Sequence, residues 1–389
     1  MKIIIHRGTK QIGGCITEIK TDNGRIFIDM GEELPGAGSL GDFWIDGVTA
    51  GRPDCDAIFI THYHGDHAGL YRDVLPGIPI FMGEVARELF LALSTWIKDD
   101  GAEKIRSFKT FKALDRIVVK DMVVTPLLVD HSAFDAYMFL IESGGRRILH
   151  TGDFRLHGFR GKALIPTLEK YVGTVDVLIT EGTSLSRDDR TFVEERELKA
   201  NAQKILAENK YTFVLCSSMN IDRIAALYHA TPKRKYFICD SYQKDILDIV
   251  TSHAKDRTSL YNFQKVTVYG SNLEDRFREC GFCMLVRSND YFSRVMQKYP
   301  DAKFLYSMWD GYRSGKYQND EIARFIADYN FISFHTSGHA SRDAIEAVCR
   351  AVSPKIGIIP IHSEAPRKLE DSKMDYAIKY LQDKEEFNL

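Results

Sequence analysis

The segment Thr61–His67 concentrates metal-binding chemistry, because three imidazoles and one carboxylate fall within it. Those four side chains are His62, His64, Asp66 and His67. Nitrogen and carboxylate ligands suit Zn²⁺ or a similar borderline metal. The segment directly follows the apolar run 57–60, which is typical of a buried strand. Since α/β proteins place their sites in loops at the carboxyl ends of strands, the pattern predicts a metal site there.

Three more ligand-type residues follow apolar runs elsewhere in the chain. They are His131, after 127–130, Asp153, after 148–152, and His362, after 358–361. Taken singly, each has a simpler structural explanation as a packed histidine or a capping aspartate. Four ligands in one loop cannot hold two metals, however, and together these residues could supply the second half of a two-metal site at one sheet edge.

Composition sets the broad class of the protein. The 389 residues leave room for two or three domains. A net charge of −2 predicts no strong nonspecific attraction to nucleic acid, although a local basic groove stays open. The seven cysteines are scattered and odd in number, which argues against a disulfide framework, and the single C-x-x-C at 280–283 is interpreted as the start of a buried strand.

The sequence also predicts a cytoplasmic protein without a membrane segment. The apolar run at the start is too short for a signal peptide, and no stretch approaches the ~20 apolar residues that cross a bilayer.

The secondary-structure pattern changes along the chain. Strands are expected at 2–6, 15–19, 25–28, 57–60, 116–129, 137–141, 147–150 and 175–179, with a helix around 84–97. After residue 186, five or so helix–strand alternations predict a parallel sheet. After about residue 330 the metal-site chemistry resumes. The second α/β unit is therefore expected to be inserted into the first, with boundaries at 1–188, 189–328 and 329–389.

The H-x-H-x-D-H spacing resembles that of the metallo-β-lactamase fold. The resemblance implies an α/β protein with an αββα sandwich and two metal ions, Zn²⁺ or alternatively Mn²⁺. Carried over residue by residue, it implies one metal on His62, His64 and His131, and a second on Asp66, His67 and His362. Asp153 would bridge the two metals, and Asp29 would support the site without being a ligand.

Further motifs resemble those of the β-CASP nucleases, the group that includes enzymes of the ribonuclease J and cleavage-and-polyadenylation kinds. Segment 178–183 resembles their motif A, with Glu181 as the acidic residue, and 334–340 resembles motif B, with His339 as the catalytic histidine. Segment 360–364 resembles motif C, although Ser363 stands where many relatives have glycine. The inserted region resembles the β-CASP domain, an α/β domain of the parallel-sheet type.

The resemblance implies hydrolysis of phosphodiesters, which a pair of metals can clamp. Asp66, Glu181 and His339 are the expected catalytic residues, with His339 as the acid and Glu181 raising its proton affinity. Phosphate contacts are expected from residues next to strand and helix ends: Ser217, Ser218, Asn220, His335, Ser337 and Gly338. For His335, a purely structural role is equally open.

Three functions are compatible with these residues. The favoured one is a ribonuclease on single-stranded RNA, with a lean towards 5′ exonuclease over endonuclease activity. DNA as the substrate and a homodimeric state both stay open. The alternative is a small-substrate hydrolase, such as a thioesterase, lactonase or non-nucleic phosphodiesterase, because fold alone does not fix function. A noncatalytic scaffold would be favoured by missing ligands, whereas all seven are present.

Overall fold

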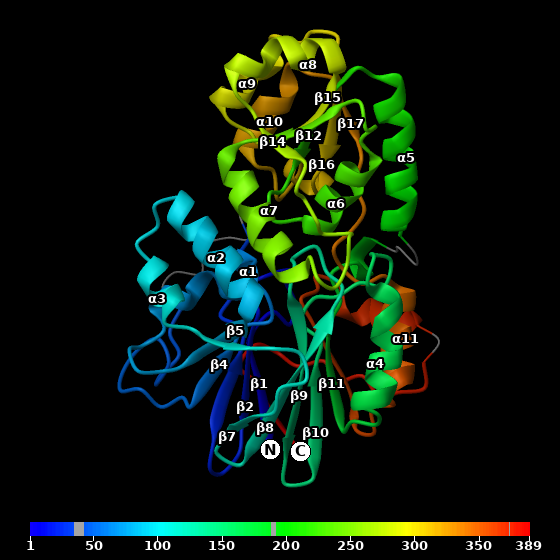
Figure 1. The fold of residues 1–389 in the computed structure, drawn as a ribbon. Helices are drawn as coiled ribbons and strands as arrows, with labels where there is room; N and C mark the ends of the chain where they lie inside the picture. Colours follow the sequence, from blue (N-terminus) through cyan, green and yellow to red (C-terminus); the bar gives the residue numbers. More distant parts are fainter. Residues whose placement is uncertain (35–42, 188–191, 373) are drawn as a thin grey trace. The chain divides into compact units, whose positions relative to one another are not determined.

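The computed structural model describes residues 1–34, 43–187, 192–372 and 374–389, and these form two compact units (Figure 1). Unit 1 comprises Met1–Phe192 and Gly338–Leu389, and unit 2 comprises Val193–Ser337. The first expected boundary, at 188/189, lies outside the described residues. The second, at 328/329, differs from the structure. Residues 329–337 belong to unit 2 because β17 (Phe331–Ser333) pairs with β16 (Lys303–Ser307).

Unit 1 contains two sheets. The first has seven strands in the order β19-β1-β2-β3-β4-β5-β6. Its strands are β1 (Lys2–Arg7), β2 (Ile16–Lys20), β3 (Arg25–Ile28), β4 (Ala57–Phe59), β5 (Ile80–Gly83), β6 (Lys109–Phe111) and β19 (Glu386–Asn388). The second has six strands in the order β18-β11-β10-β9-β8-β7. Its strands are β7 (Ile117–Val119), β8 (Met122–Val129), β9 (Ala136–Ser143), β10 (Arg146–His150), β11 (Val177–Glu181) and β18 (Gly357–Ile361).

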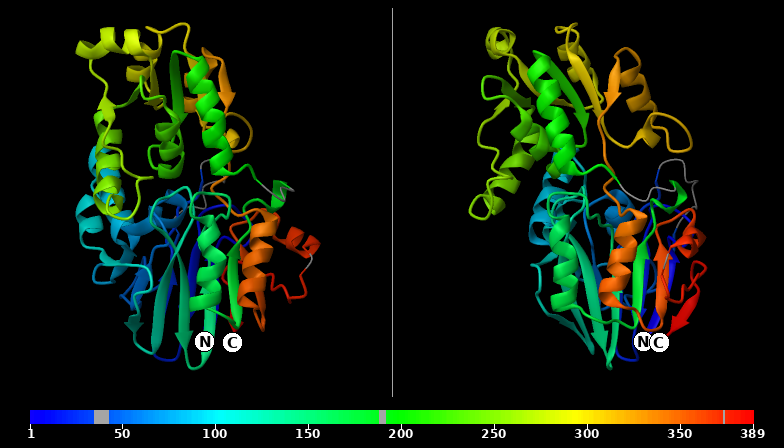
Figure 2. Two further views of the ribbon diagram at one scale, coloured as in Figure 1. Left: turned by 45° about the vertical axis from the view of Figure 1, so that its right-hand side comes forward. Right: turned by 90° about the vertical axis from the view of Figure 1, so that its right-hand side faces the viewer.

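Helices cover the outer faces of this pair of sheets. They are α2 (Glu84–Trp96), α3 (Ala102–Arg106), α4 (Leu164–Tyr171) and α11 (Arg342–Val352), whereas the short helix α1 (Gly65–Ala68) carries Asp66 and His67. Helix α2 contacts β5 and β6, whereas α4 and α11 lie side by side against the second sheet (Figure 2). The structure thus confirms the predicted αββα sandwich.

Burial along β11 and β18 shows how the layers are held together. Every residue of both strands is buried, whereas β1 alternates between buried and half-buried positions. Leu178 and Ile358 face the core under α4 and α11, and Ile179 and Ile359 face the core between the sheets. Strands covered on both faces need continuous apolar sequence, which is why these two runs are so hydrophobic.

Unit 2 is an α/β domain around one six-stranded sheet, in the order β14-β13-β15-β12-β16-β17. Apart from β16 and β17, its strands are β12 (Tyr211–Cys216), β13 (Tyr236–Cys239), β14 (Val266–Val268) and β15 (Phe282–Val286). Its helices are α5 (Glu195–Glu208), α6 (Ile221–Ala230), α7 (Ser241–Ala254), α8 (Glu274–Cys280), α9 (Asp290–Met296) and α10 (Asp320–Ala327). All pairings between these strands are parallel, as the helix–strand rhythm predicted.

Among the described residues, no helix combines the length and the hydrophobicity that crossing a bilayer requires.

Candidate metal centre

Parallel strand pairing brings the predicted site residues to one edge of the second sheet. Strand β11 lies between β10 and β18, with Ile179 opposite His150 and Glu181 opposite Ile361. Parallel strands end at the same edge, so the loops carrying Asp153 and His362 emerge beside Glu181. In the first sheet, β3 and β4 are also parallel, which brings Asp29 next to the loop that follows β4.

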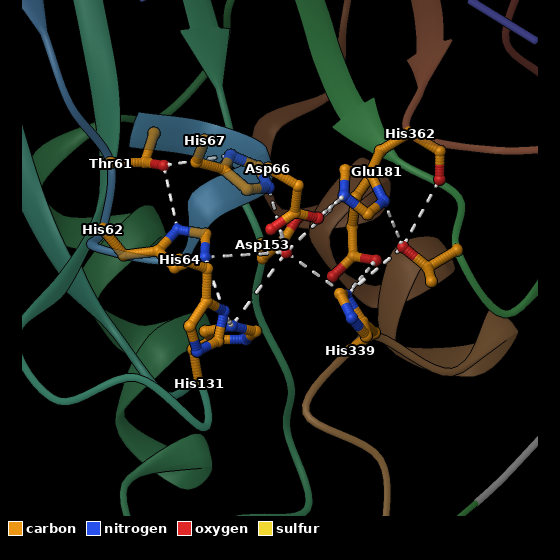
Figure 3. Close-up of polar contacts among 12 residues, drawn as sticks. Thr61, His62, His64, Asp66, His67, His131, Asp153, Glu181, His339 and His362 are labelled. Carbon is orange, nitrogen blue, oxygen red and sulfur yellow. Dashed lines mark hydrogen bonds and ion pairs between the residues drawn. The ribbon is translucent and has the colours of Figure 1, made fainter. Parts of the chain in front are cut away.

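The side chain of Asp153 lies at the centre of a cluster of imidazoles (Figure 3). Five ring nitrogens lie within 4.0 Å of its Oδ2: His67 Nε2 at 3.2 Å, His339 Nδ1 at 3.4 Å, His62 Nε2 at 3.8 Å, His362 Nε2 at 3.9 Å and His131 Nε2 at 4.0 Å. His64 Nδ1 lies 3.0 Å from His62 Nε2, and Asp66 Oδ2 lies 3.2 Å from His362 Nε2. The structure therefore gathers all seven residues that the sequence singled out as candidate ligands.

The donor atoms fit divalent metals. His62, His64 and His131 form one group whose ligand atoms lie within 4.8 Å of one another, and His62, His67 and Asp153 form another. Within the described part of the chain, neither carboxylate oxygen of Asp153 accepts a hydrogen bond, although both are buried. A buried carboxylate without hydrogen bonds is costly. A cation bound between the surrounding imidazoles would remove that cost.

Asp29 and Thr61 orient the first group of histidines. Asp29 follows β3 in a left-handed conformation (φ 64°), and its Oδ2 lies 2.7 Å from Nδ1 of His67. The Thr61 hydroxyl donates to the same carboxylate at 2.9 Å and lies 3.0 Å from Nδ1 of His62. These contacts leave the Nε2 atoms of both rings directed at Asp153, the usual arrangement around metal-binding histidines. Thr61 was not singled out from the sequence, although it directly precedes His62.

His131 is oriented from two directions. Its Nδ1 lies 2.6 Å from the carbonyl oxygen of Gly338, so this glycine, expected to contact phosphate, supports a candidate ligand in the structure. A Cβ at Gly338 would lie 2.6 Å from the Ser132 hydroxyl, so a larger residue there would displace the Ser132 side chain. The neighbouring Asp130 forms a fully buried ion pair with Arg155 at 2.7 Å, which ties the end of β8 to the loop that carries Asp153.

His339 lies beside Glu181, as expected for an acid and its partner. Glu181 Oε1 accepts hydrogen bonds from the backbone N–H groups of Phe154 and Ala340, and its Oε2 lies 3.2 Å from His339 Nδ1. The Thr183 hydroxyl lies 3.2 Å from His339 Nδ1 and 2.7 Å from Nδ1 of His362. Thr183 is thus a second orienting residue that sequence reasoning missed.

The electrostatics divide the histidines into two kinds. Burial lowers the pKa of His64 to about 4 and the pKa values of His62 and His131 well below the ordinary value, so these rings are neutral. Burial also opposes protonation of His67 and His339, but nearby carboxylates outweigh it. Asp153 and Asp29 raise the pKa of His67 well above the ordinary value, and Glu181 and Asp153 raise the pKa of His339 to about 9. The neutral rings suit metal binding, and the ring of His339, which is not among the seven candidate ligands, suits an acid.

The other residues expected to contact substrate lie in unit 2. Asn220 caps α6, its side chain accepting a hydrogen bond from the Arg223 N–H. Ser217 and Ser218 form the turn between β12 and α6, and the Ser218 carbonyl accepts a hydrogen bond from Gln243. His335 and Ser337 lie between β17 and the return of the chain to unit 1. A role in substrate binding stays a prediction for all five.

Comparison with known proteins agrees with this geometry. The profile of a family described as the β-lactamase superfamily domain matches residues 44–238, which include the candidate ligands from His62 to Asp153. The chain belongs to the β-lactamase superfamily. The resemblance drawn from the H-x-H-x-D-H spacing is thereby confirmed.

Individual relatives carry the likeness beyond the matched region. Ribonuclease J of Mycoplasma genitalium is 24% identical, over 93% of this chain and 68% of that protein. Ribonuclease J of Helicobacter pylori is also 24% identical, over 94% of this chain and 56% of that protein. A crystal structure of a protein of unknown function from Enterococcus faecalis matches with a TM-score of 0.77 at 21% identity. That match covers 100% of this chain and 99% of the other, and it shows the fold.

Proposed function

We propose that this member of the superfamily is a metal-dependent phosphodiester hydrolase that acts as a ribonuclease on single-stranded RNA. The observation that carries the proposal is the pair formed by His339 and Glu181 beside the Asp153 cluster. A metal site alone would suit many hydrolases, whereas an additional acid serves a leaving group that needs a proton. The relatives named ribonuclease J favour RNA over DNA and over a small substrate.

Two metal ions are proposed, Zn²⁺ or alternatively Mn²⁺. His62, His64 and His131 would hold one, Asp66, His67 and His362 the other, and Asp153 would contact both. Bound there, the ions would supply an activated water and neutralise charge on the phosphoryl oxygens.

His339 would donate the proton that the leaving oxygen needs. Its ring is 3.2 Å from Glu181, which keeps the imidazole protonated, and Thr183 fixes the orientation of the ring. Glu181 is itself held by two backbone N–H groups, so the pair is preorganised rather than assembled by substrate. The side chain of His339 is about a quarter exposed, at 24%, so a substrate can reach it.

For the direction of cleavage, we propose removal of nucleotides from the 5′ end. Three internally labelled single-stranded RNAs test this: one with a 5′-phosphate, one with a 5′-hydroxyl, and a circle. Release of mononucleotides that depends on the 5′-phosphate is expected. Efficient cutting of the circle would instead establish an endonuclease. The same three substrates made of DNA test whether the enzyme prefers RNA to DNA.

The Asp153→Asn variant is the control for metal dependence. Because its carboxylate lies among both sets of candidate ligands, the variant should lose both metals and all cleavage. Unaltered cleavage by this variant, or by wild-type protein freed of metal with a chelator, would refute the proposal. Hydrolysis of thioesters or lactones without any action on RNA would establish the small-substrate alternative.

A further inference from the structure

Cys15 contributes a buried sulfur to the candidate metal centre. It lies directly before β2, and its side chain is 1% exposed. Its Sγ and one ring nitrogen from each of His67 and His362 all lie within 4.8 Å of one another. A thiol and two imidazoles at this spacing are a donor set that Zn²⁺ accepts.

The backbone holds Cys15 at this position. Its N–H donates to the carbonyl oxygen of Asp66 at 3.0 Å, and its own carbonyl accepts from the N–H of Gly31 at 3.0 Å. The three backbone segments approach so closely that a Cβ at Gly31 would lie 1.8 Å from the carbonyl oxygen of Asp66 and 2.7 Å from the backbone nitrogen of Cys15. Glycine is therefore required at position 31, and the sulfur is fixed next to the loop that carries the candidate ligands.

The two histidines present their Nε2 atoms to this region. Nδ1 of His67 lies 2.7 Å from Asp29, and Nδ1 of His362 lies 2.7 Å from the Thr183 hydroxyl. Nε2 of His67 is buried and makes no hydrogen bond within the described part of the chain, although it lies 3.2 Å from Asp153 Oδ2. A buried ring nitrogen without a hydrogen bond points to a metal ligand.

We propose that Cys15 Sγ is an additional ligand of the metal held by His67 and His362. The inference rests on the proposed metal-dependent function. On binding, the sulfur forms a bond to the metal and its proton passes to solvent. Because thiolate is a soft donor, the sulfur makes this position select Zn²⁺ or Co²⁺ over Mn²⁺. The competing explanation is that Cys15 only fills space as a small apolar side chain.

Cobalt substitution of the full-length protein distinguishes these explanations. Metal-free protein is titrated with Co²⁺ while its absorption is recorded. Visible bands report cobalt in the centre, and a near-ultraviolet sulfur-to-cobalt charge-transfer band reports a Co–S bond. Both kinds of band are expected. Cobalt uptake without the charge-transfer band refutes the role of Cys15, whereas absence of cobalt uptake refutes the metal-dependent function itself.

Variants identify which cysteine supplies the sulfur that binds cobalt. Cys15→Ser should lose the charge-transfer band while keeping the visible bands. The matched control is Cys349→Ser, a change of an equally buried cysteine in α11 that packs under the second sheet, and it should retain both. A charge-transfer band that survives in Cys15→Ser refutes the proposal. If Cys15→Ser does not fold, the wild-type spectrum still decides whether a Co–S bond exists, and Cys15→Ala supplies a second variant for locating it.

Metal competition provides an independent readout. In Cys15→Ser, affinity for Zn²⁺ at the position held by His67 and His362 should fall by at least about tenfold, because loss of a residue that only supports a ligand already costs that much. Affinity for Mn²⁺ should change little, because Mn²⁺ does not favour sulfur. Equal losses for both metals would indicate a packing role and overturn the proposal.

Discussion

His339 differs from the candidate ligands His62 and His131, because the carboxylates of Glu181 and Asp153 raise its pKa to about 9, whereas burial keeps those two rings neutral. The variant His339→Ala should therefore keep its metal and lose roughly 10²–10⁴-fold in cleavage rate, the usual contribution of a positioned acid. Metal content is measured by elemental analysis and rate by single-turnover cleavage. A substrate with a better leaving group, such as a nitrophenyl phosphodiester, should be slowed less.

His229→Ala is the matched control for that variant. Its Nε2 contacts the carbonyl of Leu260 at 2.8 Å within unit 2, so metal and rate should both be retained. Loss of metal from His339→Ala would instead make His339 a ligand, in accord with its position near Asp153, Glu181 and His362.

The sequence reveals the candidate ligands and, through the resemblance, the supporting residue Asp29, but not the other residues that orient them. His131, Asp153 and His362 could be found because each is a metal-binding type placed just after an apolar run. Thr183 and the carbonyl of Gly338 carry no such signal. They act through partners 156 and 207 residues away along the chain, and only the strand order brings them together.

At the scale of elements, two buried arginines join segments that are distant in sequence. Arg155 pairs with Asp130 at 2.7 Å in unit 1, and Arg223 pairs with Glu195 at 2.6 Å in unit 2. Removing one partner of a buried pair costs about 3–5 kcal/mol, because the other charge is left uncompensated. Arg155→Met and Arg223→Met should both lower the free energy of unfolding by this amount in urea titrations.

Metal affinity separates the two variants. Arg155 holds the loop that carries Asp153, so Arg155→Met should also weaken metal binding by roughly 10–100-fold. Arg223→Met should leave metal affinity unchanged, which makes it the matched control. Equal metal affinities in the two variants would show that the Arg155 pair supports the fold alone.

Glu18 joins the first three strands and makes unit 1 sensitive to acid. It lies 2.7 Å from His6 on β1 and 2.9 Å from Arg25 on β3. Burial opposes ionisation, but these hydrogen bonds lower the pKa of Glu18 to about 2. Since an unfolded glutamate has a pKa of about 4.3, the ionised form contributes on the order of 3 kcal/mol, fully above about pH 5 and lost as pH falls to 2.

The Glu18→Gln variant tests this contribution through unfolding titrations at pH 7, 5, 4, 3 and 2. The difference in stability from wild type should be largest at pH 5–7 and should shrink towards pH 2. Glu142→Gln removes a partly exposed pair with Arg147 and should cost at most about 1 kcal/mol. A wild-type advantage over Glu18→Gln that does not change with pH would contradict the assignment.

Element boundaries were predictable where turn residues mark them. The helix expected around 84–97 is α2, and the strands expected at 2–6 and 25–28 are β1 and β3. The single strand expected at 116–129 is wrong, because β7 and β8 form a hairpin there. The turn places Lys120 in a left-handed conformation with φ 55°. Glycine or asparagine would have predicted such a turn, whereas lysine does not.

For the whole molecule, metal binding should raise the free energy of unfolding. Among the candidate ligands of the described chain, His67 and Asp153 have buried atoms without hydrogen bonds, and an ion bound to them would favour the folded state. A free metal concentration of 100 times the dissociation constant raises the free energy of unfolding by about 2.7 kcal/mol. For a unit of this size, that corresponds to a rise of roughly 5–10 °C in Tm. Differential scanning calorimetry with added Zn²⁺ should show this rise. Asp153→Asn should abolish it, and an unchanged Tm in wild type would count against a metal centre.

The division into units was less predictable than the site. The return of metal-site residues after the α/β alternation indicated an insertion. Its second boundary was placed too early, because β17 has only three residues and directly precedes the segment that contains His339. So short a strand gives no periodicity of its own, and its pairing with β16 assigns it to unit 2.

The order of the candidate ligands along the chain has a consequence for biosynthesis. Six of them lie before unit 2, whereas His362 and the proposed acid His339 follow it. A nascent chain that has emerged only as far as unit 2 can complete neither the centre nor the acid. Under the proposed function, cleavage therefore requires synthesis of the chain through His362, and a polypeptide interrupted before that residue would carry an incomplete set of ligands.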